Sequence, residues 1–303
     1  MASRPLDLAP RSGRPPSPGG ASPPAGVHRG PWARFVRNPR ALAGAWIMFA
    51  FVTVAAAGPR LAPFPPAAPH VLDILRAPGG AYPMGTDNLG RDVLSRVLVA
   101  SRVSLAIGVL SMVVSIVAGV LVGTLAGFFG GHVDGALMRA TDVVLAIPVF
   151  FLTVAFLALF GPSVGRLIWI IGLTAWPPTA RLVRVEVLAL RSRDFVTAVR
   201  ATGASNARII VRHLLPNVVP VIVISATLRV GLAILTEAGL SFLGLGVQPP
   251  QPSWGNIIAD GREYLGLAWW VSFFPGLCVF LAVMAFNLVG DGLRDAFDPR
   301  LQI

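Results

Sequence analysis

Long runs of apolar residues, separated by short polar segments, dominate this sequence. A helix rises about 1.5 Å per residue, so about 20 apolar residues cross the hydrocarbon core of a bilayer. By this criterion the pattern predicts six membrane-spanning helices, at residues 41–57, 103–129, 136–160, 167–185, 218–237 and 267–289. We therefore expect an all-α membrane protein with six transmembrane helices.

Two of these runs need further argument. The first ends in Ala55-Ala56-Ala57, which resembles a signal-peptide cleavage site, but the region of some 40 residues before it is too long for a signal peptide. The fourth contains Pro177 and Pro178, which must kink or end a helix. We expect this fourth span to face other helices, because they can satisfy the carbonyl groups that proline leaves free.

Glycines recur along the second predicted span, at positions 108, 119, 123 and 127. Glycine lets two helix backbones approach each other closely within a membrane. We expect this span to pack tightly against its neighbours.

The distribution of arginine predicts the orientation. Short cytoplasmic loops carry an excess of positive charge. With the N-terminus inside, seventeen Arg fall on the inner side and seven on the outer side, and residues 181–216 alone contain seven. We therefore expect both termini to be cytoplasmic.

The predicted organisation follows from this topology. Residues 1–38 are rich in Pro, Gly, Ser and Arg and cannot bury enough apolar surface to fold, so we expect a disordered cytoplasmic tail. Residues 39–102 would form the first transmembrane helix and an external segment. Residues 103–303 would form a core of five transmembrane helices, with a cytoplasmic loop at 181–216.

Composition excludes several classes of function. The chain of 303 residues is 54% hydrophobic and 13% charged, with a mean hydropathy of +0.71, which argues against a soluble enzyme. All 25 basic residues are Arg, so the chain lacks the Lys that a Walker A nucleotide site or a Schiff base requires. The net charge of +11 lies between apolar runs, which favours membrane topology over nucleic-acid binding.

No catalytic or metal site is predicted. A single cysteine, Cys278, excludes an intrachain disulfide and a cysteine-based metal cluster. The four His are scattered without the i, i+4 pairing of a metal site. An intramembrane enzyme would need a nucleophile with its base, or metal ligands, within the spans, and neither pattern occurs.

Residues 181–216 contain a predicted helix, turn and helix. The stretch from Phe195 to Thr202 ends at Gly203, which can adopt the left-handed conformation that closes a helix. Ser205 or Asn206 can cap the next helix. The first helix carries an apolar face at Phe195, Val196 and Val199 that so small a loop cannot bury, and such a face usually binds a partner.

This loop resembles the cytoplasmic loop of binding-protein-dependent ABC importer permeases. Residues 194–204 read DFVTAVRATGA and residues 212–217 read RHLLPN, against a family pattern of Glu-Ala-Ala, then Gly, then a distal Leu-Pro. Thr197 stands at the Glu position and Val199 at the second Ala, so the acidic contact of the motif is missing. Gly203 and the Leu215-Pro216 pair remain.

Three further segments resemble the C-type permeases of dipeptide, oligopeptide and nickel systems. They are GTDNLGRDVLSR at 85–96, LSFLGLGVQPP with PSWG at 240–255, and NLVGDGLRDAFDPR at 287–300. The resemblance spans about Arg37 to Arg300. It implies a type I ABC importer permease fold with a cytoplasmic coupling helix.

The resemblance also implies a function. The chain would be a multi-pass subunit in the bacterial cytoplasmic (inner) membrane that moves di- or oligopeptides, without an ATPase site of its own. Its partners would be a second homologous permease, two ABC ATPase subunits that bind ATP, and an external substrate-binding protein. The residues that would couple to the ATPase are Phe195, Val196, Thr197, Ala198, Val199, Arg200, Gly203, Ala204, Arg208 and Arg212.

Alternatives stay open on this sequence. The same machinery could import nickel or another small solute, and the loop could be an ordinary surface hairpin. An ATP-independent secondary transporter would show inverted repeats or several intramembrane acids. We find no convincing repeat, and Glu237 is the one such acid.

Two charged residues fall in or at the end of the fifth span. Arg229 and Glu237 lie eight residues apart, so both would project on nearly the same side and could line a translocation pathway. For Glu237 the alternative is a helix-end carboxylate hydrogen-bonded to neighbouring segments. Outside the membrane, we expect Asp87, Arg91 and Asp92 to form a structural network that orients the second span.

Overall fold

The computed structural model describes residues 31–297, which within that range form helices and no β-strand. The helices are α1 (Pro31–Arg37), α2 (Pro39–Leu61), α3 (Val93–Phe129), α4 (Gly131–Ala146), α5 (Val149–Phe160), α6 (Val164–Ala175), α7 (Pro177–Arg191), α8 (Asp194–Ala201), α9 (Asn206–Ile209), α10 (Leu215–Phe242), α11 (Trp254–Gly261) and α12 (Trp270–Phe297). A π-helical turn, η2 (Ile210–Leu214), joins α9 to α10, and short 3₁₀ turns lie at η1 (Val71–Asp73) and η3 (Arg262–Tyr264).

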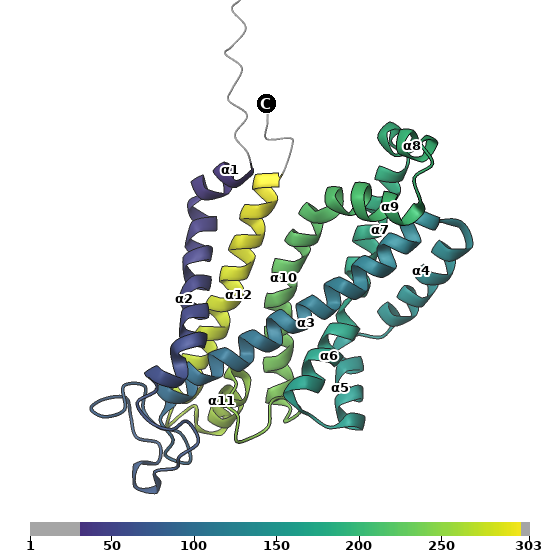
Figure 1. Cartoon of the computed structure of the whole chain (residues 1–303). Coiled ribbons are helices and arrows are strands. Elements are labelled where there is room, and N and C mark those ends of the chain that lie inside the picture. Colours follow the sequence, from purple (N-terminus) through teal and green to yellow (C-terminus); the bar gives the residue numbers. More distant parts are fainter. Residues whose placement is uncertain (1–30, 298–303) are drawn as a thin grey trace, which may run out of the picture.

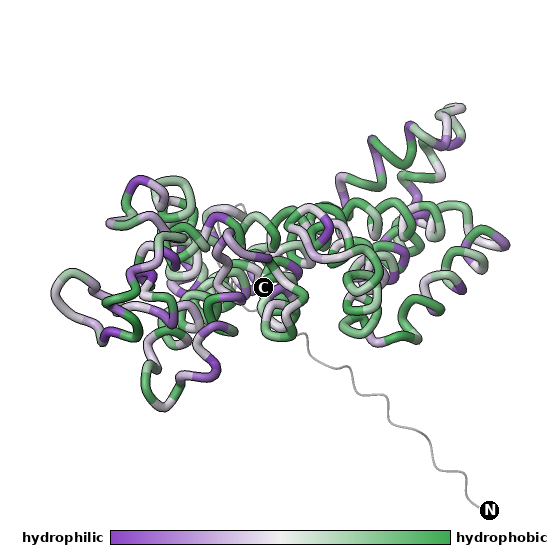
Figure 2. The backbone as a smooth tube through the Cα atoms, turned by 90° about the horizontal axis from the view of Figure 1, so that it is seen from below, coloured by the Kyte–Doolittle hydropathy of each residue, from purple (hydrophilic) through white to green (hydrophobic). Residues whose placement is uncertain are grey.

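Four of these segments are long and apolar enough to cross a membrane: α2, α3, the run from α9 through α10, and α12. The bent pair α4 and α5 makes a fifth. In Figure 2 the spans are mainly green and apolar, with purple polar positions concentrated in loops and at helix ends. The remaining expected span corresponds to α6 and α7, so the six-helix prediction is roughly confirmed.

Several predicted boundaries are wrong. Helix α3 begins at Val93, ten residues before the expected start, because Asp92 caps it by accepting the backbone N–H of Ser95 at 2.8 Å. The third span bends by 82° between α4 and α5. Pro148 causes this bend, since it donates no hydrogen bond and forces Ile147 before it out of the helical conformation. The fourth span breaks at Trp176, where Pro177 starts α7.

The predicted end of the disordered tail, at residue 38, is wrong. Residues 31–37, which we assigned to it, form helix α1, while residues 1–30 lie outside the described range. Helix α1 is ordered because it packs on the end of α12, where Asn38 donates to Asp295 at 3.3 Å. The Asn38 side chain also caps α2.

Helix α3 is the central element, and it packs against α2, α6, α7 and α10 (Figure 1). Its glycines make the close contacts that we predicted. A Cβ atom on Gly123 would lie 2.4 Å from the carbonyl oxygen of Ala180, and one on Gly119 would lie 2.6 Å from Thr179. Because small residues supply the contact between helices within lipid, these positions hold α7 against α3.

Helices α6 and α7 together run parallel to α3. Gly172 on α6 contacts Val114, near the middle of α3, whereas Val187 on α7 contacts Gly127, at the end of α3. Pro177 is buried between them, as we expected for a span that faces other helices. The two short helices therefore act as one crossing despite the break at Trp176.

The bundle has two distinct ends (Figure 1). At one end, here called the hairpin end, lie α8, α9, the start of α1 and the end of α12. At the opposite end, here called the α11 end, lie α11 and the segment between α2 and α3. The described ends of the chain therefore share one side with the predicted coupling loop, as the topology requires.

The close contact at Gly123 yields a stability prediction. We expect Gly123→Ala to destabilise the protein by about 1–3 kcal/mol, because its methyl group would overlap the Ala180 carbonyl. The matched control is Gly165→Ala, at an exposed position of α6 where no atom lies within 4 Å of the new Cβ. Thermal unfolding of the purified protein in detergent measures both. Equal melting temperatures for the two variants would contradict the packing role.

Candidate functional site

The coupling hairpin has the predicted helix, turn and helix. Gly203 has a φ of +80°, in the left-handed region, and comes after Thr202, the C-cap residue of α8. Ser205, one of the two predicted caps, accepts the backbone N–H of Arg208 and starts α9. No atom lies within 4 Å of a Cβ built on Gly203, so the backbone angle alone selects glycine there.

The apolar face of α8 differs from the expectation. Val196 is fully buried and Val199 is half-buried, so these two residues are not free to bind a partner. Val196 belongs to one buried apolar cluster with Ile209 of α9, Leu214 of η2 and Val183 of α7. Phe195 is 41% exposed and is the large apolar side chain that α8 does present to solvent.

The other predicted coupling residues lie mostly on the surface of the hairpin. Exposed members are Thr197, Ala198, Arg200, Gly203, Arg208 and Arg212, and Ala204 is half-buried. The Arg200 guanidinium lies 5.9 Å from the centre of the Phe128 ring, a cation–π distance that ties α8 to the end of α3.

The loop itself is shorter than predicted. Residues 181–191 continue helix α7, because they pack on α3 and are held by two arginines. Arg184 forms a double hydrogen bond with Asp134 of α4, with 2.6 Å between Nη2 and Oδ2, and Arg191 donates to the Phe128 carbonyl at 2.8 Å. The hairpin outside the helix bundle therefore starts near Ser192.

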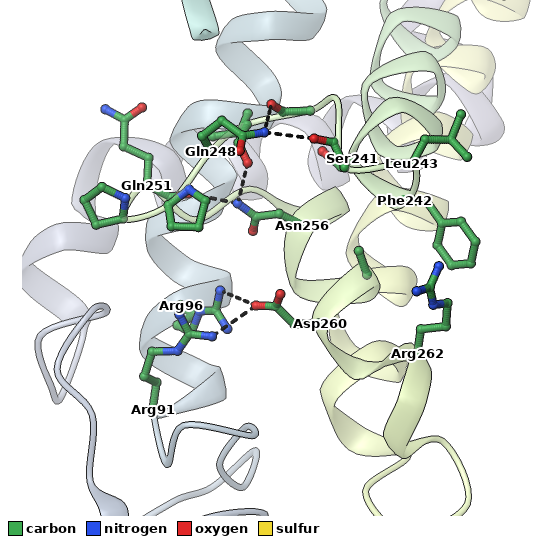
Figure 3. A pocket seen from close by; sticks show the side chains of 16 residues that line it. Arg91, Arg96, Ser241, Phe242, Leu243, Gln248, Gln251, Asn256, Asp260 and Arg262 are labelled. Atoms are coloured by element: carbon green, nitrogen blue, oxygen red, sulfur yellow. Dashed lines mark hydrogen bonds and ion pairs between the residues drawn. The ribbon is translucent and has the colours of Figure 1, made fainter. Parts of the chain in front are cut away.

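A cavity of about 500 Å³ opens at the α11 end (Figure 3). It is bounded by the start of α3, the end of α10, the loop at 243–251, and α11. Asn256 closes one side of it by donating to the carbonyls of Val247 and Gln251, at 3.1 and 2.9 Å.

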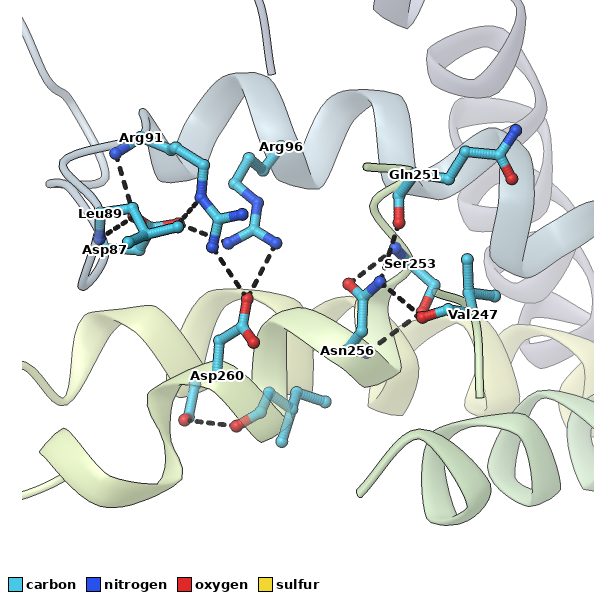
Figure 4. Close-up of polar contacts among 11 residues, drawn as sticks. Asp87, Leu89, Arg91, Arg96, Val247, Gln251, Ser253, Asn256 and Asp260 are labelled. Atoms are coloured by element: carbon cyan, nitrogen blue, oxygen red, sulfur yellow. Dashed lines mark hydrogen bonds and ion pairs between the residues drawn. The ribbon is translucent and has the colours of Figure 1, made fainter. Parts of the chain in front are cut away.

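Arg91, Arg96 and Asp260 line this cavity, and Asp87 contacts both arginines from outside the lining. Asp87 is fully buried and accepts Arg91 Nε at 2.7 Å and Arg96 Nη1, and its other oxygen accepts the backbone N–H of Leu89. Arg91 and Arg96 also both donate to Asp260 of α11 at 3.0 Å, as Figure 4 shows. The expected network is confirmed for Asp87 and Arg91, which Arg96 and Asp260 complete, whereas the Asp92 carboxylate lies outside it and caps α3 by accepting Ser95.

Helix α11 is fastened to the bundle by a second set of polar contacts. The Trp254 backbone donates to Ser104 of α3 at 3.0 Å, and the indole of Trp254 donates to the Val97 carbonyl at 3.3 Å. Ser253 caps α11 and donates to Glu237 of α10 at 2.8 Å. The α11 end is therefore a rigid, cross-linked layer.

The two charged residues of the fifth span do not share a cavity. Glu237 is fully buried, and its Oε1 accepts Ser241 and Ser253 at 2.7 and 2.8 Å. The Oε1 contacts of Glu237 match the structural alternative, a carboxylate bound to neighbouring segments, while its buried Oε2 has no hydrogen-bond partner among the described residues. Arg229 lines a separate small cavity of about 30 Å³ with Ser111 and Ser115 of α3.

Comparison with known proteins gives the family. Residues 119–303 match the model described as binding-protein-dependent transport system inner membrane component, and residues 29–78 match the N-terminal TM domain of oligopeptide transport permease C. The chain belongs to the binding-protein-dependent permease family. The match at 119–303 contains the hairpin, α10 and α11 of this permease, while Asp87, Arg91 and Arg96 lie between the two matched regions.

Full-length relatives of this permease are named for transport of small peptides. The di/tripeptide transport system permease protein DppC of Pseudomonas aeruginosa is 42% identical over 93% of this chain and 96% of its own. The dipeptide transport system permease protein DppC of Escherichia coli K12 is 45% identical over 89% of this chain and 92% of its own. The glutathione transport system permease protein GsiD of Pectobacterium atrosepticum is 39% identical over 89% of this chain and 90% of its own.

Solved structures show the same fold. Two inward-facing crystal forms of the MetNI methionine ABC transporter align with this permease at TM-scores of 0.55 and 0.51 and at 21% and 22% identity. The alignments cover 67% and 65% of this chain, and 97% and 94% of the other chains. The protein thus has the type I ABC importer permease fold.

Sequence reasoning missed some residues of these sites. Asp260 carries no local signal, because its partners Arg91 and Arg96 lie more than 160 residues away. Ser111 and Ser115 did carry a signal, since they are polar and four residues apart within an apolar run, the spacing of one helix face.

The buried charge network yields a second prediction. We expect Asp87→Asn to lower stability by about 3–5 kcal/mol, because it removes the buried carboxylate that Arg91 and Arg96 share and leaves Asp260 as their one remaining acidic partner among the described residues. The matched control is Asp142→Asn, which removes an acid that is 57% exposed in its pair with Arg181 and should cost less than about 1 kcal/mol. Melting temperatures in detergent measure both. Similar losses in the two variants would contradict the structural role of the network.

Proposed function

We propose that this permease carries di- or oligopeptides across the bacterial cytoplasmic membrane as a transmembrane subunit of an ATP-driven importer. The observation that carries the proposal is full-length similarity, at 42–45% identity, to permeases named for di/tripeptide and dipeptide transport. Glutathione, named for a third relative, is itself a tripeptide.

We propose four partners for this chain: a second homologous permease, two ABC ATPase subunits, and an external substrate-binding protein. The description of the matched family as binding-protein-dependent supports the last of these. In this arrangement the ATPase subunits bind ATP, and this chain has no ATPase site or cofactor of its own. The absence of Lys from the sequence supports the assignment of ATP binding to the other subunits, because a Walker A site needs a Lys.

We propose that the hairpin end faces the cytoplasm, so that both termini are cytoplasmic and the α11 end faces outward. The excess of Arg on the predicted inner side supports this orientation. The external binding protein would then meet the α11 end, with its cavity and cross-linked loops.

In the proposed mechanism, the hairpin passes motion of the ATPase subunits to the spans. The exposed side of α8, with Phe195, Ala198 and Arg200, is available to dock on an ATPase subunit. The buried side places Val196 in one apolar cluster with residues of α7, α9, η2 and α10. A displacement of α8 would therefore move α7 and α10 through packed side chains, which resist independent sliding.

The names of the similar permeases favour peptides over nickel or another solute as cargo. Membership of a binding-protein-dependent family argues against an ATP-independent secondary transporter.

The orientation predicts a labelling pattern. In a Cys278→Ala background, we expect Ser192→Cys, exposed at the hairpin end, to react with a membrane-impermeant maleimide in inverted vesicles and not in spheroplasts. The matched variant is Leu72→Cys, 97% exposed before α3, which should react in spheroplasts and not in inverted vesicles. Labelling with the opposite sidedness would overturn the proposed orientation.

Peptide uptake tests the function and the role of Gly203 together. In a strain that lacks this chain and keeps its partners, we expect uptake of a radiolabelled dipeptide to be lost and to return with the wild-type gene. Gly203→Val should reduce that uptake roughly 5- to 30-fold, because the left-handed φ costs about 1–2 kcal/mol in a residue with a side chain.

Gly203→Asn is the matched control, since Asn tolerates the left-handed region. We expect it to restore most of the uptake. Unchanged dipeptide uptake in the deletion strain would refute the peptide function. Equal uptake by Gly203→Val and the wild type would refute the role of the turn.

A further inference from the structure

Arg229 is a charged residue in the middle of a membrane-spanning helix. It lies about 20 Å along the helix axis from either end of α10, at about 1.5 Å per residue. Within residues 31–297, no hydrogen bond or ion pair satisfies its guanidinium, and its side chain is half-buried. Since an ionised group at this depth is costly to insert, such residues usually face a cavity or a ligand.

The neighbours of Arg229 are also unsatisfied. Ser111 and Ser115 of α3 are 1% exposed, and their hydroxyl groups have no hydrogen-bond partner among the described residues. Both serines line the cavity of about 30 Å³ that Arg229 borders. Thr236, on the same cavity, is different, because its hydroxyl donates to the Leu232 carbonyl at 2.8 Å.

The chemistry of this cavity selects an anion. Its lining contains one guanidinium, hydroxyl groups and apolar side chains, and no acidic residue. A guanidinium matches a carboxylate in charge and in its fork geometry, and hydroxyl groups can donate to the same oxygens. The volume is that of one water-sized group, so the cavity takes the end of a molecule and leaves the rest outside.

The depth of Arg229 in the membrane distinguishes two possible sources of such an anion, a lipid phosphate and a peptide carboxylate. Lipid phosphates lie at the membrane surface, some 20 Å along the helix from this position. A peptide that crosses the membrane must pass the depth of Arg229. Every di- or oligopeptide with a free C-terminus carries a carboxylate at that terminus. This step rests on the proposed function.

We propose that Arg229, Ser111 and Ser115 form an intramembrane recognition site for the C-terminal carboxylate of the transported peptide. Arg229 supplies the charge, and the two serines on α3 orient the carboxylate by hydrogen bonds. The site lies between α3 and α10, which are packed against each other, so occupancy by a carboxylate would bridge two of the spans.

The test uses the assembled transporter in proteoliposomes, with its ATPase subunits, partner permease and binding protein. The substrates are L-alanyl-L-alanine and its C-terminal amide, each at a concentration that saturates the binding protein. Transport per ATP hydrolysed is measured for both. Because the binding protein is the same throughout, a change in the ratio of the two rates reports on the permease.

We expect the wild type to prefer the free acid at least tenfold, and Arg229→Gln to bring this ratio close to one by slowing transport of the acid. Arg229→Lys, which keeps the charge, should retain a clear preference for the acid. Ser111→Ala and Ser115→Ala should each reduce the preference two- to fivefold. The matched control is Arg60→Gln, which removes an exposed arginine at the end of α2 and should leave the ratio unchanged.

Basal ATP hydrolysis and size-exclusion profiles confirm that each variant assembles. Equal slowing of the acid and the amide by Arg229→Gln would overturn the proposal, because a structural role or a pairing with an acid of the partner permease acts on both substrates. A wild type that carries the amide as fast as the acid would also overturn it. A wild type that carries neither would refute the proposed function itself.

Discussion

The close packing of small residues along α3 is the constraint on which the rest of the structure depends. Within lipid, apolar side chains gain little by leaving one apolar environment for another, so helices associate through van der Waals contact at close range. Gly119, Gly123 and Gly127 let the backbone of α7 approach α3 closely, and Gly108 makes room for the Ile234 side chain of α10. These contacts set the register of α6 and α7, and that register places the hairpin at the end of the bundle opposite to α11.

The two ends of the bundle are built from different interactions. At the α11 end, buried charges and capped helix termini hold the loops, and Asp87 and Asp260 each accept both arginines. At the hairpin end, α8 is attached mainly through Val196 in an apolar cluster and through the contact of Arg200 with Phe128. Apolar contacts are not directional, so such an attachment can transmit motion while the charged network at the other end keeps its geometry.

Polar groups within the spans fall into two kinds. Glu237 accepts hydrogen bonds from Ser241 and Ser253 through Oε1. The second of these links α10 to the N-terminus of α11, which is a structural role. Arg229, Ser111 and Ser115 have no partners among the described residues and lie together at one cavity. A buried polar group that lacks a partner is costly, so the two buried serine hydroxyls beside the half-buried Arg229 mark a place where the protein departs from its most stable arrangement.

The sequence by itself determined the class of protein, the approximate number of crossings and the turn at Gly203. These follow from local physics: the length of apolar runs and the freedom of glycine at positive φ. Only the tertiary structure decided the 82° bend before α5, the burial of Val196, the link from Arg91 and Arg96 to Asp260, and the separation of Glu237 from Arg229. Each of these depends on which distant helix packs against the residue, and hydropathy along one chain does not contain that information.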